Sequence, residues 1–161
     1  MYNDLKLDNI LVGNESLNPK TMDKIRLIDF GFASRYLDST GRHISQEDVD
    51  IFRGNMVFAS VNVFAFRTPS RRDDLISLCY LLVYIMKNGD VPFMVDHSMA
   101  KSEAYLYLQE VKQRLTPEQL CGPPHSRTWQ LLPLVKAAFS LTFEQVPDYK
   151  EYRKHLRLCL L

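Results

Sequence analysis

Four polar residues near the N-terminus are of the types that perform acid-base and metal chemistry. Asp4, Lys6 and Asn9 lie in one short segment, and Asp29 follows twenty residues after Asn9. Phosphoryl transfer needs a carboxylate that orients a hydroxyl and accepts its proton, a cation that offsets charge, and oxygen ligands for magnesium. Asp4 supplies the first, Lys6 the second, and Asn9 with Asp29 the third. The sequence therefore predicts a phosphoryl-transfer site.

Two short apolar runs are expected to bring these residues together. Residues 10–12 and 25–28 are rich in Ile, Leu and Val and favour β-strands, and residues 13–24 form a polar loop between them. We expect the two runs to pair as a small hairpin. The hairpin would place the turn at 4–9 beside Asp29.

Neither motif is decisive alone. The triplet Asp29-Phe30-Gly31 is short enough to occur by chance, and residues 4–9 could equally form a solvated turn. Together, with a strand after Asn9 and Leu27-Ile28 before the triplet, they match the catalytic loop and the metal-binding triplet of protein kinases. The combination makes the solvated-turn interpretation a minor alternative.

From residue 2 to about residue 157, the sequence resembles the casein kinase I group of serine/threonine kinases. The most telling stretch is Ala59-Ser60-Val61-Asn62, because that group has a Ser-Ile-Asn-type triplet where most protein kinases have Ala-Pro-Glu. The run Ser70 to Leu75 resembles the start of the central helix of the group's large lobe. The similar segments are 29–36, 42–44, 54–62, 69–78, 117–121 and 147–153.

The resemblance implies a role for each candidate residue. Asp4 would be the catalytic carboxylate and Lys6 the phosphate-facing lysine typical of serine/threonine kinases. Asn9 and Asp29 would bind the cofactor as magnesium ligands, with ATP as phosphoryl donor and proteins as substrates. Asp74, at the start of the central helix, would be structural and would bond the backbone of the catalytic loop, since a buried carboxylate needs such partners.

Several features depart from the group's pattern. Tyr2 and Asn3 replace His-Arg, so a phosphate on the following loop would find no arginine at position 3. Val57 replaces an arginine that helps bind pre-phosphorylated substrates, which leaves that preference open. No Gly-x-Gly-x-x-Gly loop or Val-Ala-Ile-Lys strand is present. The resemblance thus implies a large lobe whose partner, the small N-terminal lobe, is absent.

The expected fold class is mainly α (α+β). We expect a protein-kinase-like C-terminal lobe with a small β-hairpin, in which residues 1–161 form one partial kinase domain. Residues 75–86 are apolar on nearly every face, so they indicate a central buried helix over 71–88, capped by Ser70 and by Asn88-Gly89. Residues 31–70 show no period and should be mostly irregular. Four side chains of this helix are expected in the core: Leu78, Leu81, Leu82 and Ile85. We expect further helices at 100–114, 128–142 and 148–160, with a loop between the first two of them.

Composition limits the partners. Twenty Lys and Arg against nineteen Asp and Glu give a net charge of +1, so no strong field attracts nucleic acid or a membrane surface. The apolar run is too short to span a bilayer. Three widely spaced cysteines argue against a disulfide framework, and the N-terminus has no secretory signal. These features predict an intracellular protein of the cytoplasm or nucleus, bound to neither nucleic acid nor membrane.

Two functions remain open. The chain is either a truncated casein kinase I-like serine/threonine kinase, active in its full-length form, or a non-catalytic pseudokinase that binds partners through the large lobe alone. The presence of Asp4, Lys6, Asn9 and Asp29 favours the kinase, since a binding module has no physical need for all four. Either way, we expect the isolated chain to be inactive.

Overall fold

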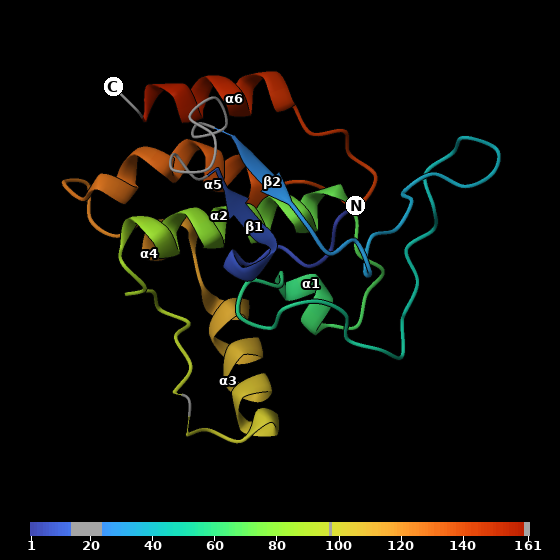
Figure 1. Cartoon of the computed structure of the whole chain (residues 1–161), viewed down its shortest axis with the longest axis horizontal. Coiled ribbons are helices and arrows are strands. Elements are labelled where there is room, and N and C mark those ends of the chain that lie inside the picture. The colour runs from blue at the N-terminus through green and yellow to red at the C-terminus, as the bar shows by residue number, and fades with distance from the viewer. Residues whose placement is uncertain (14–23, 97, 160–161) are drawn as a thin grey trace.

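A computed structural model describes residues 1–13, 24–96 and 98–159, and helix α2 (Arg71–Met86) lies at its centre (Figure 1). The 3-10 helix η3 (Arg127–Leu131) and helices α4 (Pro117–Cys121) and α5 (Leu132–Phe139) all pack on α2. Helix α6 (Tyr149–Leu158) covers α5. The core surrounds α2 and includes side chains of this helical layer together with Phe64, Phe93 and Leu108. The central position of α2 agrees with the sequence prediction.

The caps of α2 explain its bounds. Ser70 is the N-cap residue, but its side chain makes no capping bond; instead the Asp73 carboxylate accepts a 2.7 Å bond from the Ser70 amide. At the other end Asn88 and Gly89 have positive φ values of 51° and 89°. Their amides bond to Ile85 O and Tyr84 O, which is a Schellman arrangement. The predicted helix is therefore confirmed over Arg71–Met86, and residues 87–89 form its C-terminal cap.

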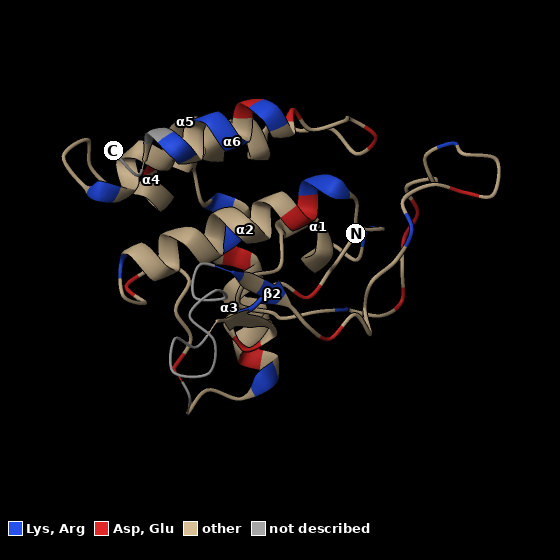
Figure 2. Cartoon of the chain, turned by 45° about the horizontal axis from the view of Figure 1, so that its top comes forward, with Lys and Arg blue, Asp and Glu red and all other residues tan. Residues whose placement is uncertain are grey.

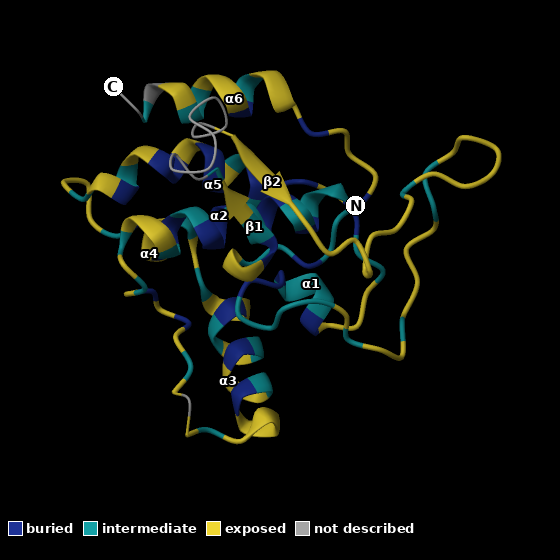
Figure 3. Cartoon of the chain, viewed as in Figure 1, coloured by how far each residue is buried: buried dark blue, intermediate teal, exposed yellow. Residues whose placement is uncertain are grey.

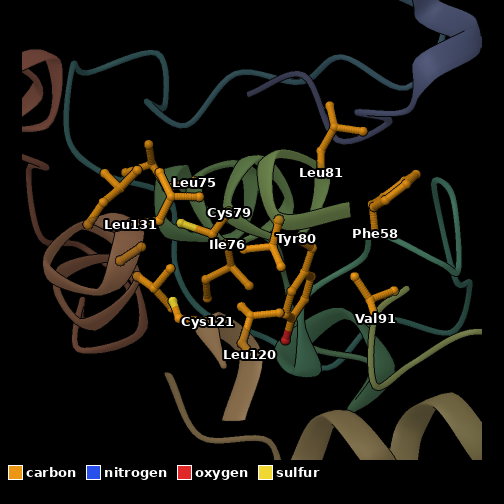
Figure 4. Close-up of a cluster of buried hydrophobic side chains, with 14 of the residues drawn as sticks. Phe58, Leu75, Ile76, Cys79, Tyr80, Leu81, Val91, Leu120, Cys121 and Leu131 are labelled. Atoms are coloured by element: carbon orange, nitrogen blue, oxygen red, sulfur yellow. The ribbon is translucent and has the colours of Figure 1, made fainter. Parts of the chain in front are cut away.

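The expected burial of α2 is only partly correct. Leu81 is 2% exposed, and Leu78 and Leu82 are half-buried against the core, but Ile85 is 49% exposed. Figure 4 shows the reason, because Ile76 and Cys79 occupy the side of α2 that faces the α4 and η3 side chains. Leu78, Leu82 and Ile85 share another side, which fewer elements cover. A run that is apolar all round does not reveal which side the fold covers.

Strands β1 (Ile10–Val12) and β2 (Ile25–Leu27) form the predicted hairpin. They pair antiparallel, with Ile10 opposite Leu27, in a sheet of two strands within the described ranges. Both strands are largely exposed (Figure 3). The predicted polar loop lies almost wholly at 14–23, outside the described residues.

Three differences concern the other helices. Helix α3 (Lys101–Arg114) matches the prediction, but the expected helix at 128–142 is divided into η3 and α5 and ends at Phe139. Helix α4 occupies part of an expected loop, capped by Thr116, which accepts a bond from the Gln119 amide. The mostly irregular 31–70 segment also contains the short helix α1 (Val61–Phe64). The fold is mostly helical with one two-stranded antiparallel sheet.

Candidate functional site

The turn before β1 brings three predicted site residues into contact. Asp4 and Asn9 are buried, at 2% and 4% exposure. The 3-10 helix η1 (Leu7–Asn9) turns the Asn9 amide back, so that its Nδ2 donates to Asp4 O at 3.0 Å and to Asp4 Oδ2 at 2.9 Å. The Asn9 amide nitrogen is therefore committed to Asp4.

Lys6 lies at the open side of this turn. Its Nζ is 3.0 Å from Asp4 Oδ2, and about a quarter of its side chain is exposed. The hydrogen bond to Asp4 raises the pKa of Lys6 above its ordinary value, and Asp29 adds a smaller Coulombic contribution in the same direction. Lys6 is therefore a cation at neutral pH, with a carboxylate beside it and an exposed face.

The hairpin brings Asp29 to the same edge. The Ile28 amide donates to Asn9 O at 3.0 Å, and the Tyr2 hydroxyl donates to Ile28 O. Asp29 itself is exposed, with a φ of 57°, and its Oδ1 accepts a 3.2 Å bond from the Gly31 amide. The backbone thus places Asp29 next to the turn, while its carboxylate stays at the surface.

The same edge holds the oxygen atoms that a hard cation prefers. Asn9 offers an amide oxygen and Asp29 a carboxylate, which suit magnesium by their chemistry. In the described parts of the chain, no group of three or more His, Cys, Asp or Glu side chains could hold a metal ion. The assignment of Asn9 and Asp29 as magnesium ligands stays a prediction.

Asp74 fixes the turn at residues 2–9 to α2, as expected from the sequence. Its Oδ2 accepts from the Tyr2 amide at 2.7 Å and its Oδ1 from the Asn3 amide at 2.8 Å. Burial raises the pKa of Asp74, while these two backbone bonds oppose the rise. Figure 2 shows the charged first turn of α2 close to the N-terminus. The structural role predicted for Asp74 is confirmed.

Asn3 has a role that the sequence did not indicate. Its φ is 68°, and its Nδ2 donates to Phe32 O at 2.8 Å and to Ser34 Oγ at 2.9 Å. Its own carbonyl lies against Gly54, where an added Cβ would be 2.2 Å from Asn3 O. Asn3 therefore joins the turn to the segment after Asp29, and Gly54 is needed for close approach.

A pocket of about 430 Å³ opens beside this junction. It lies between the N-terminal segment, the start of α2 and the irregular segment, which extends away from the helices in Figure 1. Its walls include Asn3, Asp74 and Ala59, and three arginines contribute to its lining: Arg35, Arg53 and Arg67. Arg67 pairs with Asp48 at 3.0 Å. Sequence patterns did not indicate this pocket, because its residues come from segments without period.

Sequence comparisons relate this chain to casein kinase I homologs. No protein-family model matches the chain. Casein kinase I homolog 1 of Saccharomyces cerevisiae is 31% identical over 157 residues, which is 97% of this chain and 28% of that protein. Casein kinase I homolog 2 of Schizosaccharomyces pombe is 31% identical over 92% of this chain and 33% of its own length. The chain is homologous to casein kinase I.

The match to casein kinase I extends to a third organism and covers only part of each relative. A probable casein kinase I homolog of Encephalitozoon cuniculi is 29% identical over 93% of this chain and 44% of its own length. The chain thus spans between about a quarter and a half of the length of these relatives.

None of the helices within the described ranges has the length and apolarity needed to cross a membrane.

Proposed function

We propose that this chain is the catalytic-turn and large-lobe part of a casein kinase I-like serine/threonine kinase, which transfers the ATP γ-phosphate to protein hydroxyls in a longer form. The observation that carries the proposal is the contact of Asp4, Lys6 and Asn9 in one turn fastened to α2. Homology to casein kinase I over more than 90% of the chain supports it.

Each residue then has a distinct task. Asp4 orients the incoming hydroxyl and accepts its proton, because its Oδ2 lies at the turn beside Lys6. Lys6 offsets negative charge on the moving phosphoryl group. Asn9 and Asp29 would hold magnesium, which supplies charge neutralisation at the phosphates. The Asn9 bond to Asp4 keeps the carboxylate oriented toward the substrate side.

The longer form is part of the proposal. Nucleotide pockets generally enclose about 70 to 90% of the ligand surface. The chain spans only 28% of one relative and 44% of another. Two magnesium ligands on an exposed edge compete poorly with hydration. We therefore expect the 161-residue chain alone to bind Mg-ATP weakly and to phosphorylate nothing.

A direct test compares the chain with a chimera in which the preceding region of a yeast relative is joined before Met1. We expect calorimetry to detect micromolar Mg-ATP binding in the chimera only. Casein phosphorylation should appear in the chimera and disappear in Asp4→Asn. Phosphorylation by the chimera that persists in Asp4→Asn would refute the assigned role of Asp4.

The exposed apolar hairpin favours the second candidate, a non-catalytic binding module. Val12 and Ile25, which pair across the strands, are 68% and 71% exposed, and Phe30 is 62% exposed. Such a patch marks an interaction surface more often than a solvated one. An ATP-binding chimera that transfers no phosphate, while the chain still associates with another protein, would favour this module over the kinase.

A further inference from the structure

The end of helix α3 contains a buried lysine with an unusual set of partners. Lys112 is 3% exposed, and its Nζ donates to three main-chain carbonyls: Met56 O at 2.9 Å, Val57 O at 2.6 Å and Ala59 O at 2.7 Å. An ammonium group has three donors, so every one is used. Among the described residues, no carboxylate forms an ion pair with Lys112.

Aromatic rings complete the surroundings of this ammonium. Its Nζ lies 5.0 Å from the ring centre of Phe64, 4.8 Å from that of Tyr80 and 5.2 Å from that of Phe93. Tyr80 extends from α2 into the space between Leu120 and Val91 (Figure 4). Ring faces attract cations at these distances. Carbonyls and rings together therefore replace the water that Lys112 loses.

Two more side chains of α3 bind the same segment. Tyr105 Oη donates to Phe64 O at 2.7 Å, and Gln109 Nε2 donates to Phe64 O at 3.3 Å. With Lys112 they are spaced four and three residues apart, so the three donors lie on one face of α3. This face, Tyr105, Gln109 and Lys112, is the α3 donor row. It satisfies carbonyls of residues 56–64 that no strand or helix ladder satisfies.

The segment held by Lys112 reaches the candidate site. Gly54 lies against the Asn3 carbonyl and near Asp4 Cα, and Ala59 lines the pocket beside Asn3. The Ser60 hydroxyl fixes the far end by donating to Asp73 Oδ1 at 2.5 Å. Residues 54–60 thus bridge α3 and the catalytic turn, and a peptide that approaches Asp4 would meet them.

We propose that Lys112 is a positioning residue that holds the 54–60 segment against the catalytic turn and thereby sets the affinity for the protein substrate. The effect on substrate affinity rests on the proposed kinase function, whereas the effect on the 54–60 segment does not. The amine does not touch the reacting atoms; it acts through the three carbonyls that it binds. A neutral side chain of the same length would leave all three carbonyls without a donor.

The first test uses the 161-residue chain and does not depend on kinase activity. In Lys112→Met, we expect the protected amides of Phe58 and Ala59 to exchange with solvent at least tenfold faster than in wild type. Amides of α5 should keep their rates, and Lys101→Met on the exposed start of α3 should change neither set. Equal acceleration in α5 and the segment would show only global destabilisation and would overturn the proposal.

A measurement on the wild-type chain covers the case in which Lys112→Met does not fold. Nuclear magnetic resonance should detect scalar couplings between the Lys112 Nζ and the carbonyl carbons of Met56, Val57 and Ala59. It should also find ammonium protons that exchange slowly. Fast exchange without these couplings would overturn the proposal.

The second test examines the effect on substrate in the chimera described above. Lys112→Met should raise the KM for a peptide substrate at least fivefold, while kcat and the KM for ATP change less than twofold. A loss confined to kcat would overturn the substrate role. An inactive wild-type chimera would instead refute the proposed function, and the exchange experiment would still decide whether Lys112 holds the segment.

Discussion

The two halves of the candidate site are held in different ways. Asp4 and Asn9 are buried and bonded to each other, and the turn that contains them is fastened to Asp74. Asp29 is exposed; its backbone neighbour Ile28 bonds to the turn, whereas its own carboxylate bonds to the Gly31 amide. Buried polar groups that bond to one another make a rigid unit. The turn at residues 2–9 is therefore preorganised, whereas the position of the Asp29 carboxylate depends on what binds to it.

The largest effect is expected at Asp29, where a substitution should remove activity but leave the free energy of unfolding nearly unchanged. In the active chimera, Asp29→Asn should abolish magnesium-dependent phosphorylation, because the change removes the charge of a metal ligand and nearly preserves its shape. Stability in urea should change by less than about 0.5 kcal/mol, since the side chain is exposed. Turnover near the wild-type rate would exclude Asp29 as a ligand.

The next effect concerns the preorganised half. Asp74→Ala should lower the free energy of unfolding by about 2 to 4 kcal/mol, because the Tyr2 and Asn3 amides lose their acceptors. Urea denaturation of the 161-residue chain measures this loss. Asp48→Ala is the matched control, since its ion pair with Arg67 is exposed and should contribute less than about 1 kcal/mol. Equal losses in both variants would mean that the turn is not fastened by Asp74.

The free energy of unfolding should depend on pH through the buried Lys112. Burial lowers the pKa of Lys112 well below its ordinary value, so the unfolded chain binds more protons between the two pKa values. The free energy of unfolding should then rise with pH through that window, by at most about 1.4 kcal/mol per pH unit. Urea denaturation from pH 7 to 10 should show wild type gaining stability relative to Lys112→Met. A constant difference would contradict the prediction.

The smallest effect is expected on the hairpin. Val12→Thr should change stability by no more than about 0.5 kcal/mol, because Val12 is 68% exposed and threonine also favours strands. The same urea experiment measures it. Ile25→Thr, on the opposite strand, should behave alike. A loss above about 1 kcal/mol would mean that a second copy of the chain covers the hairpin in solution.

Local patterns predicted some elements well. The apolar run of α2 and the Asn88-Gly89 pair indicated the helix and its end, and two short β-favouring runs indicated the hairpin. Helix α4 was missed because five residues around Thr116-Pro117 carry too little period to separate a short capped helix from a loop. The predicted burial of Ile85 was wrong, because composition alone does not show which side of a helix packs against other elements.

Some residues of the candidate site were predicted from the sequence, and others were not. Residue types and spacing identified Asp4, Lys6, Asn9 and Asp29, and the structure brings the first three into contact. Nothing in the local sequence indicated Asn3 as a junction, because its partners Phe32 and Ser34 lie about thirty positions away. Lys112 was missed for a related reason: a lysine near a helix end usually faces solvent.

By itself, the sequence determined what is encoded within a few neighbouring residues: the bounds of α2, the pairing of the hairpin strands, and the acid, amine and amide of the catalytic turn. Only the tertiary structure decided the burial of a charge and its partners. Whether Lys112 binds three carbonyls depends on residues 53 to 56 positions away in the chain. The physical reason is that desolvation and hydrogen bonding depend on the atoms that surround a group in space.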